Sequence, residues 1–205
     1  MHDEVLTQLA TEILPSLVHF EDFYLVGGTA LALQIGHRRS VDFDLFSEKP
    51  LSAGLLAKVK RVCAPRSVAV TYRSSEQLNV LINNIKTTFL FFPYPVIKPL
   101  LSYKGLPLAS VSEIATTKAF AIGKRLSFKD YVDWYFMLKE NRVTLADVIV
   151  LANKKFGGDF NDRLFLGQLV SLSDVPPQTI DFLRGGVDKA EIERFLEQEV
   201  KKFAL

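Results

Sequence analysis

The sequence has few of the residues that build disulfides, zinc sites and nucleic-acid clamps. Its one cysteine, Cys63, excludes an internal disulfide, and three scattered histidines form no Cys/His zinc pattern. Lys and Arg number 25 against 23 Asp and Glu, so the formal net charge is only +2 and no basic tail is present. The apolar run at 88–92 is far too short to cross a bilayer, and the acidic start of the chain argues against a signal peptide. We therefore predict a cytoplasmic protein that has no membrane partner and contacts nucleic acid only through a local patch.

The hydrophobic residues are numerous enough for a sizeable core, at 48% of the chain with 11% aromatic. Alternating apolar patterns occupy the first half, and helical periodicity dominates the second half. This order predicts an α+β layer over residues 1–105 and a helical subdomain over residues 106–205. We expect strands at 23–26, 41–46, 67–72, 78–82 and 85–92, and helices at 3–18, 29–35, 52–63, 110–125, 129–139, 144–156, 159–172 and 188–202.

Two details of the strand region can be predicted from local chemistry. Asn83 and Asn84 tolerate positive φ, so they are expected to join two neighbouring strands as a tight hairpin. Along the strand at 67–72, strict alternation would place Val68, Val70 and Tyr72 on one side.

The most informative motif is a glycine turn followed by two aspartates. An apolar strand runs into Gly27-Gly28-Thr29, and a second strand carries Asp42 and Asp44. Because side chains alternate along a strand, both carboxylates lie on one face, where they repel each other unless a cation such as Mg²⁺ binds between them. A glycine turn that opens a helix presents backbone N–H groups to an anion. The motif therefore predicts a site for a metal–triphosphate complex; the alternatives are the polar side of an edge strand and a tight turn that needs glycine.

These residues resemble the signature of the DNA polymerase β-type nucleotidyltransferase superfamily. The sequence at 27–31 and 39–44 is similar to the motifs of the AbiEii/AbiGii toxin family of nucleotidyltransferases. Segments 118–125 and 129–138 resemble the downstream motifs of that family, so the resemblance runs from about 23 to 138. It implies a polymerase β-like nucleotidyltransferase fold, with a mixed sheet, flanking helices and a C-terminal helical subdomain.

The resemblance also implies an activity and partners. The protein would be a Mg²⁺-dependent nucleotidyltransferase, with Mn²⁺ as an alternative ion, that transfers an NMP from an NTP to an acceptor hydroxyl. The implied acceptor is RNA, at the 3′ end of tRNA. The implied role is the toxin of a toxin–antitoxin or abortive-infection system, with a cognate antitoxin protein as partner. Two alternatives stay open: a transferase with a protein or small-molecule acceptor, and a catalytically silent module that binds nucleotide or a partner protein.

The resemblance assigns catalytic roles to four residues. Asp42 and Asp44 would hold the metal, Lys118 would reach the β- and γ-phosphates, and Asp130 would orient Lys118 or bind the nucleotide. The nucleotide-binding residues are expected to be Gly27, Gly28, Thr29, Arg39, Lys118, Arg125 and Asp133. Ordinary alternatives are a solvated loop at Arg39, a solvated basic face for the later cations, and two carboxylates that complement a helix dipole.

One position departs from the superfamily pattern. A third carboxylate usually completes the metal site from a neighbouring strand, but the matching strand at 85–92 carries no acid. Thr87 or Thr88 would stand in that place. Either two carboxylates suffice, or an acid such as Asp130 or Glu76 arrives from elsewhere, or the protein is catalytically impaired.

Overall fold

The structure is a computed structural model that describes residues 1–122 and 127–204. The chain divides into two compact units, and each is described here by itself. The first unit comprises Met1–Pro95 and Pro99–Ser110, and the second comprises Val96–Lys98 and Val111–Leu205. Residues 106–110, which a division at 105 assigns to the helical part, thus belong to the first unit.

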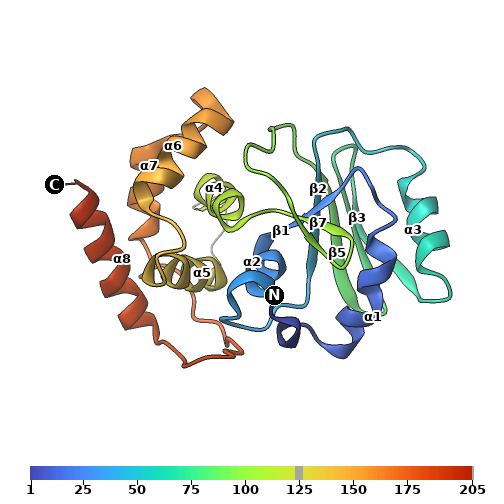
Figure 1. Cartoon of the computed structure of the whole chain (residues 1–205), viewed down its shortest axis with the longest axis horizontal. Coiled ribbons are helices and arrows are strands. Elements are labelled where there is room, and N and C mark those ends of the chain that lie inside the picture. Colours follow the sequence, from blue (N-terminus) through green and yellow to red (C-terminus); the bar gives the residue numbers. More distant parts are fainter. Residues whose placement is uncertain (123–126, 205) are drawn as a thin grey trace. The chain divides into compact units, whose positions relative to one another are not determined.

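The first unit is built on a mixed sheet, shown edge-on in part in Figure 1. Its strands are β1 (Tyr24–Val26), β2 (Phe43–Ser47), β3 (Val68–Arg73), β4 (Gln77–Ile82), β5 (Ile85–Phe91), β6 (Leu101–Tyr103) and β7 (Leu106–Leu108). Their order across the sheet is β3-β4-β5-β2-β1-β7-β6. The pairs β2–β5 and β1–β7 are parallel, and the other neighbours are antiparallel. The predicted mixed sheet with flanking helices is therefore confirmed.

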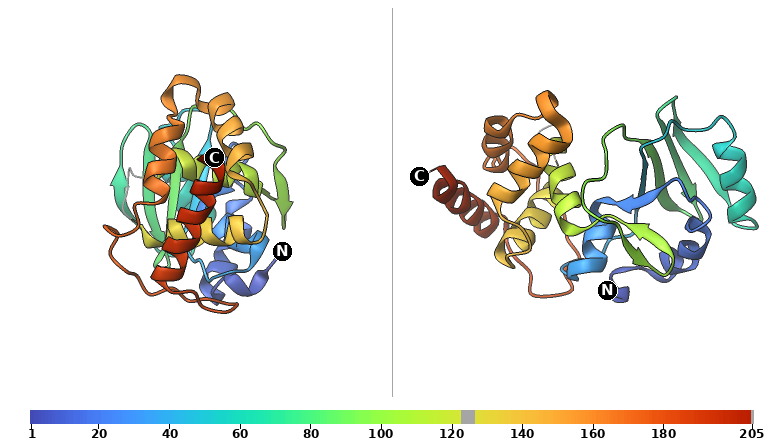
Figure 2. Two further views of the ribbon diagram at one scale, coloured as in Figure 1. Left: turned by 90° about the vertical axis from the view of Figure 1, so that its left-hand side faces the viewer. Right: turned by 45° about the horizontal axis from the view of Figure 1, so that its top comes forward.

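Four short helices accompany the sheet: η1 (Asp3–Val5), α1 (Gln8–Leu17), α2 (Gly27–Ile35) and α3 (Leu55–Cys63). Helices α1 and α3 pack together at one side of the sheet (Figure 2). The sheet face toward them carries Phe43, Leu45 and Phe89, which are fully buried. The Phe20 ring, which follows α1, packs on Phe89 with 4.9 Å between ring centroids. We call this face the covered face.

The opposite face carries Asp44 and Phe46 of β2, and we call it the aspartate face. Both side chains are half-buried, in contrast to their buried neighbours Phe43 and Leu45. The strict alternation along β2 explains this difference, because its burial pattern switches at every residue. The predicted alternation is confirmed from Phe43 to Ser47, whereas Asp42, which was also expected in the strand, precedes it.

The predicted hairpin is confirmed, whereas the predicted alternation of the strand before it is wrong at its end. Asn83 and Asn84 have φ of 44° and 66° and join β4 to β5. In β3 the register with β4 shifts between Val70 and Tyr72, so one extra residue bulges out. Because the bulge interrupts the alternation, Tyr72 lies on the face opposite to Val68 and Val70.

The second unit is helical. It contains α4 (Val111–Ala121), α5 (Phe128–Lys139), α6 (Leu145–Phe156), η2 (Gly157–Asp159), α7 (Asp162–Leu169) and α8 (Lys189–Ala204). In Figure 1 these helices run from yellow-green to red. Within residues 1–122 and 127–204, no helix is both long and apolar enough to span a membrane.

Several element boundaries differ from the predictions. The helix expected at 3–18 divides into η1 and α1, and α1 continues through Pro15 to Leu17. The helix expected at 159–172 is shorter, because η2 and a break precede α7. Strand β6 was not predicted; it pairs with β7 at the sheet edge, and three residues carry too weak a pattern to detect.

Candidate functional site

Gly27 and Asp44 meet at the N-terminal end of α2. Val26, the last residue of β1, pairs with Asp44 of β2, so the next residue lies directly beside the carboxylate. A Cβ atom on Gly27 would be only 2.5 Å from Asp44 Oδ2, and the φ of Gly27 is +75°. Space and backbone conformation therefore both require glycine here. The close approach places an acidic oxygen against the first turn of the helix.

Arg38 lies against the next glycine. A Cβ atom on Gly28 would be 2.6 Å from Arg38 Nη2, and the Arg38 side chain is buried at 3% exposure. Its Nη1 donates a hydrogen bond to the Arg39 carbonyl at 3.0 Å, which orients the guanidinium. The N-cap of α2 is Val26, whose side chain makes no capping hydrogen bond. A buried cation and the N-terminus of α2 therefore lie together, and both attract anions.

Two residues predicted to bind nucleotide have other contacts in this structure. The exposed Arg39 donates through Nη1 to the carbonyl of Glu4 at 3.1 Å. Thr29 is buried, and its hydroxyl contacts Ser40 Oγ at 2.9 Å and the carbonyl of Asp42. The Thr29 hydroxyl thus holds the segment that leads into β2. The sequence places Arg38 and Arg39 in the same loop but does not distinguish the arginine that reaches the glycine turn.

Asp42 and Asp44, the two predicted metal ligands, lie at the start of β2. Asp42 directly precedes β2, and both Asp42 and Asp44 are half-buried. Thr88 of β5 pairs with Asp44 and occupies the neighbouring position on the aspartate face, whereas Thr87 lies on the covered face. No group of three His, Cys, Asp or Glu residues arranged to hold a metal occurs among the residues that the structure describes. Two carboxylates still fit Mg²⁺, which is commonly held by one or two carboxylates together with substrate phosphates and water.

The other acids considered for the third position have contacts of their own. Glu76 is exposed in the turn before β4, where its carbonyl accepts a hydrogen bond from the N–H of Phe91. Asp130 belongs to the helical unit and pairs with Lys118.

A second cluster of charged residues is buried in the helical unit. Lys118 of α4 forms ion pairs with two carboxylates of α5, at 2.6 Å to Asp130 Oδ1 and 2.7 Å to Asp133 Oδ2. Burial alone would lower the pKa of Lys118, but the charges of Asp130 and Asp133 outweigh it and raise the pKa. The ammonium group is therefore charged and held in place, not solvated on a basic face. Asp133 is fully buried, so its observed role is to support Lys118.

Arg125, the remaining predicted nucleotide-binding residue, lies outside the described residues.

The helical unit also contains a buried ion pair that the sequence did not reveal. Glu113 Oε2 and Lys155 Nζ are 2.5 Å apart, and both side chains are buried. Glu113 Oε1 accepts hydrogen bonds from the N–H groups of Ile97 and Lys98, at 2.7 Å each. The pair thus anchors the short segment 96–98 to the helical unit.

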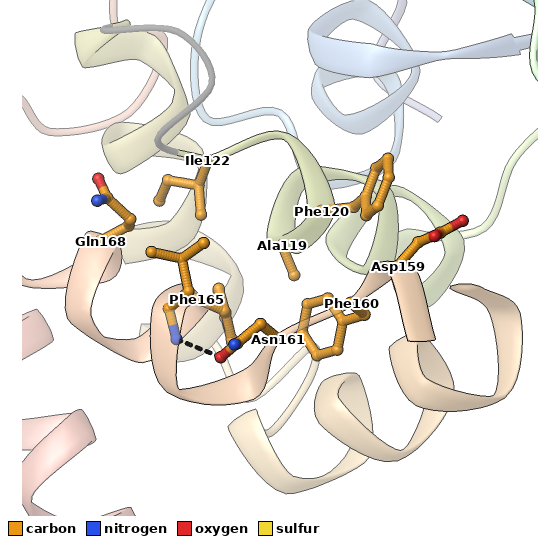
Figure 3. A pocket seen from close by; sticks show the side chains of 9 residues that line it. Ala119, Phe120, Ile122, Asp159, Phe160, Asn161, Phe165 and Gln168 are labelled. Atoms are coloured by element: carbon orange, nitrogen blue, oxygen red, sulfur yellow. Dashed lines mark hydrogen bonds between the residues drawn. The ribbon is translucent and has the colours of Figure 1, made fainter. Parts of the chain in front are cut away.

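A small cavity of about 140 Å³ lies beside α4 in the helical unit. Phe160 and Phe165 point into it, as Figure 3 shows, with Asn161 between them. The Asn161 side chain caps α7, because its Oδ1 accepts the N–H of Leu164 at 2.9 Å. None of the residues predicted to act in catalysis lines this cavity.

Comparison with known proteins finds similarity over nearly the whole chain. Residues 9–204 match the family described as nucleotidyl transferase AbiEii toxin, type IV toxin–antitoxin system. The uncharacterized protein aq_aa25 of Aquifex aeolicus (strain VF5) is 31% identical over 199 residues, which cover 95% of this chain and 94% of that protein.

Two crystal structures from Helicobacter pylori have a similar fold. One is of a "putative nucleotidyltransferase", which is 17% identical in sequence and superposes with a TM-score of 0.60. The match covers 100% of this chain and 98% of that chain. The other is of JHP933, which is 16% identical and superposes with a TM-score of 0.52. That match covers 97% of this chain and 98% of that chain. These likenesses confirm the predicted polymerase β-like nucleotidyltransferase fold. The chain belongs to the AbiEii family of nucleotidyltransferase toxins of type IV toxin–antitoxin systems.

Proposed function

We propose that this protein transfers an NMP from a Mg²⁺-bound NTP to a hydroxyl group of RNA, with the 3′ end of tRNA as the acceptor. The observation that carries the proposal is the contact of Gly27 with Asp44, because a helix end that would bind an anion and a carboxylate that would hold a cation lie side by side there. A cognate antitoxin would oppose the activity in the cytoplasm, as membership of this toxin family implies.

The first unit would bind the triphosphate and its cation. The N–H groups at the start of α2 and the guanidinium of Arg38, which lies against Gly28, would bind phosphate oxygens. Asp42 and Asp44 would hold Mg²⁺, with Mn²⁺ as an alternative, on the aspartate face. The cation, when bound, would neutralise the phosphates and lower the pKa of the acceptor hydroxyl. Gly27 contributes by its missing side chain, which leaves the carboxylate of Asp44 undisturbed.

Lys118 would supply a further positive charge to the β- and γ-phosphates. An ammonium group has three N–H donors, and Asp130 and Asp133 provide two acceptors for them. The third donor would be directed to a phosphate oxygen. Asp130 would act as the orienting residue, and Asp133 would hold the group from the buried side. This assignment combines the family resemblance with the observed cluster.

Thr88 is the observation that favours a second candidate function. It occupies the position on β5 beside Asp44 where the superfamily commonly has a third acid. A protein with only two carboxylates would serve as a catalytically silent nucleotide-binding module if two ligands do not suffice. We favour the transferase, because Mg²⁺ completes its coordination with substrate phosphates and water.

Label transfer tests the proposal directly. Purified protein is incubated with Mg²⁺, total tRNA and each α-labelled NTP in turn, beside the variants Asp44→Asn and Glu76→Gln. We expect label in RNA with the wild type and Glu76→Gln, and at least about a hundredfold less with Asp44→Asn, because removal of electrostatic groups at a reacting centre costs about that much. EDTA should abolish transfer, and added Mg²⁺ or Mn²⁺ should restore it.

The negative outcomes separate the alternatives. NTP binding without transfer to any acceptor would favour the silent module. Label on protein would redirect the search to protein acceptors. Transfer to RNA that persists in Asp44→Asn would refute the metal assignment.

A further inference from the structure

The aspartate face carries a row of side chains that leads from Asp44 to the sheet edge. Asp44 pairs with Thr88, Thr88 pairs with Asn79, and Asn79 pairs with Tyr72. Paired residues on neighbouring strands project from the same face of a sheet. The four side chains therefore lie in one line across β2, β5, β4 and β3.

The β-bulge in β3 is the reason that Tyr72 belongs to this row. Val70 pairs with Val80, a buried residue of the covered face, and Tyr72 would share that face if the strand were regular. The extra residue, Thr71, moves Tyr72 to the aspartate face, where 52% of its side chain is exposed. Bulges often redirect a side chain close to an active site. Here the consequence is an exposed aromatic ring at the outer end of the row.

The chemistry of the row suits single-stranded nucleic acid. Neighbouring strands are about 4.8 Å apart, so three steps place Tyr72 about 14 Å from Asp44. Between them lie Thr88, which is buried, and the half-buried Asn79, whose side-chain oxygen accepts a hydrogen bond from the Gln77 amide at 2.9 Å. Lys86 is exposed on the same face, two residues before Thr88. Neutral hydrogen-bonding groups, one cation and a flat ring match the sugar, the phosphate and the base of a nucleotide.

The direction of the row also indicates on which side of Asp44 the acceptor would bind and on which side the NTP would bind. In phosphoryl transfer the attacking and leaving oxygens lie roughly in line, on opposite sides of the phosphorus. The anion site at Gly27 and Gly28 lies toward β1, whereas the row runs from Asp44 in the other direction, over β5, β4 and β3. If pyrophosphate leaves toward α2, the acceptor hydroxyl approaches over the row.

We propose that this row binds the last nucleotides of a single-stranded RNA acceptor, with a base stacked on Tyr72 and a phosphate at Lys86. The inference rests on the proposed function, because it assigns the acceptor side of the same site. It commits to single-stranded RNA, since the face offers a stacking ring and one nearby cation instead of the dense positive charge that double-stranded nucleic acid requires.

Binding of a short oligonucleotide tests the inference without the need for catalysis. The dissociation constant of a fluorescent hexanucleotide with a tRNA-like 3′ end is measured for the full-length wild type and for Tyr72→Ala, Tyr72→Phe and Val70→Ala. Tyr72→Ala should weaken binding about fivefold to a hundredfold, which corresponds to the loss of one stacked base. Tyr72→Phe keeps the ring and should stay within about twofold. Val70 is the matched control, because it is 43% exposed on the other face of the same strand.

The outcomes separate this inference from the proposed function. An unchanged oligonucleotide affinity in Tyr72→Ala, or equal weakening in Val70→Ala, would overturn the inference even if label transfer to RNA succeeds. Failure of the wild type to bind single-stranded RNA, or a preference for a duplex, would also overturn it. Tyr72-dependent binding without label transfer would support the inference and contradict the transferase. The NTP dissociation constant should be the same in all four proteins.

Discussion

At the scale of single residues, two adjacent arginines have different positions. Arg38 is buried against Gly28, whereas Arg39 is exposed and bonded to the N-terminal segment. The glycine itself is part of the cause, because the missing Cβ makes the space that the guanidinium occupies. The sequence analysis predicted that Arg39 binds the nucleotide, whereas the packing places Arg38, not Arg39, against the glycine turn.

Substitution of the two arginines tests this distinction. Arg38→Ala should weaken NTP binding about tenfold to a hundredfold, the usual effect of losing a hydrogen bond to a charged group. Arg39→Ala should change it less than about twofold. Calorimetric titration with a non-hydrolysable NTP measures both, and thermal melting checks that both variants are folded. If Arg39→Ala has the larger effect, Arg38 only supports the structure.

At the scale of elements, α5 makes contacts on several sides at once. Nine consecutive residues from Asp130 to Leu138 are buried, so the helix has no solvent-exposed face in this stretch. One side supplies the carboxylates that hold Lys118, and Tyr135 on another side donates to Glu191 of α8 at 2.6 Å. Burial and the Glu191 carboxylate raise the pKa of Tyr135 to about 12.

The Tyr135 hydroxyl should therefore stabilise the helical unit in a pH-dependent way. In the unfolded chain this tyrosine ionises near pH 10, whereas in the folded protein it keeps its proton to about pH 12. The contribution to the free energy of unfolding is complete below pH 10 and is lost between pH 10 and about 12. Tyr135→Phe should lower the free energy of unfolding by about 1–2 kcal/mol at pH 7.

The variant should also lose stability less steeply than the wild type above pH 10. Urea unfolding, followed through the fluorescence of the single tryptophan, Trp134, measures both effects because that residue is buried beside Tyr135 on α5. Equal slopes for the two proteins in this range would contradict the proposed pKa shift.

At the scale of the whole molecule, the near-zero net charge limits how RNA binds. A formal net charge of +2 provides no general attraction for a polyanion, so any affinity has to come from a few local contacts. For single strands, each phosphate contact contributes about −0.7 to the slope of log K against log salt concentration.

The salt dependence of RNA binding should therefore be shallow. With the one phosphate contact proposed at Lys86, the slope for the hexanucleotide should be about −0.7, and Lys86→Ala should bring it close to zero. Titration at several salt concentrations measures both values. A slope of about −5 or steeper would indicate an extended basic surface instead.

The sequence by itself determined the features that depend on neighbouring residues. Asn83 and Asn84 predict the hairpin because they accept positive φ, and the glycine turn and the alternation along β2 follow from backbone preferences over a few residues. The α+β order follows in the same way from the apolar periodicity of each half. The family resemblance pointed to Lys118 and Asp130, but their role as nucleotide-site residues stays a prediction.

Only the tertiary structure decided which distant side chains come together. The close approach of Gly27 and Asp44, the enclosure of Lys118 by Asp130 and Asp133, and the position of Arg38 each join segments that are separated along the chain. The bulge that turns Tyr72 to the aspartate face depends on the register with β4, which strict alternation within β3 cannot reveal. The physical reason is the same in each case. The packing of whole elements sets burial and strand register, and the backbone preferences of neighbouring residues do not encode that packing.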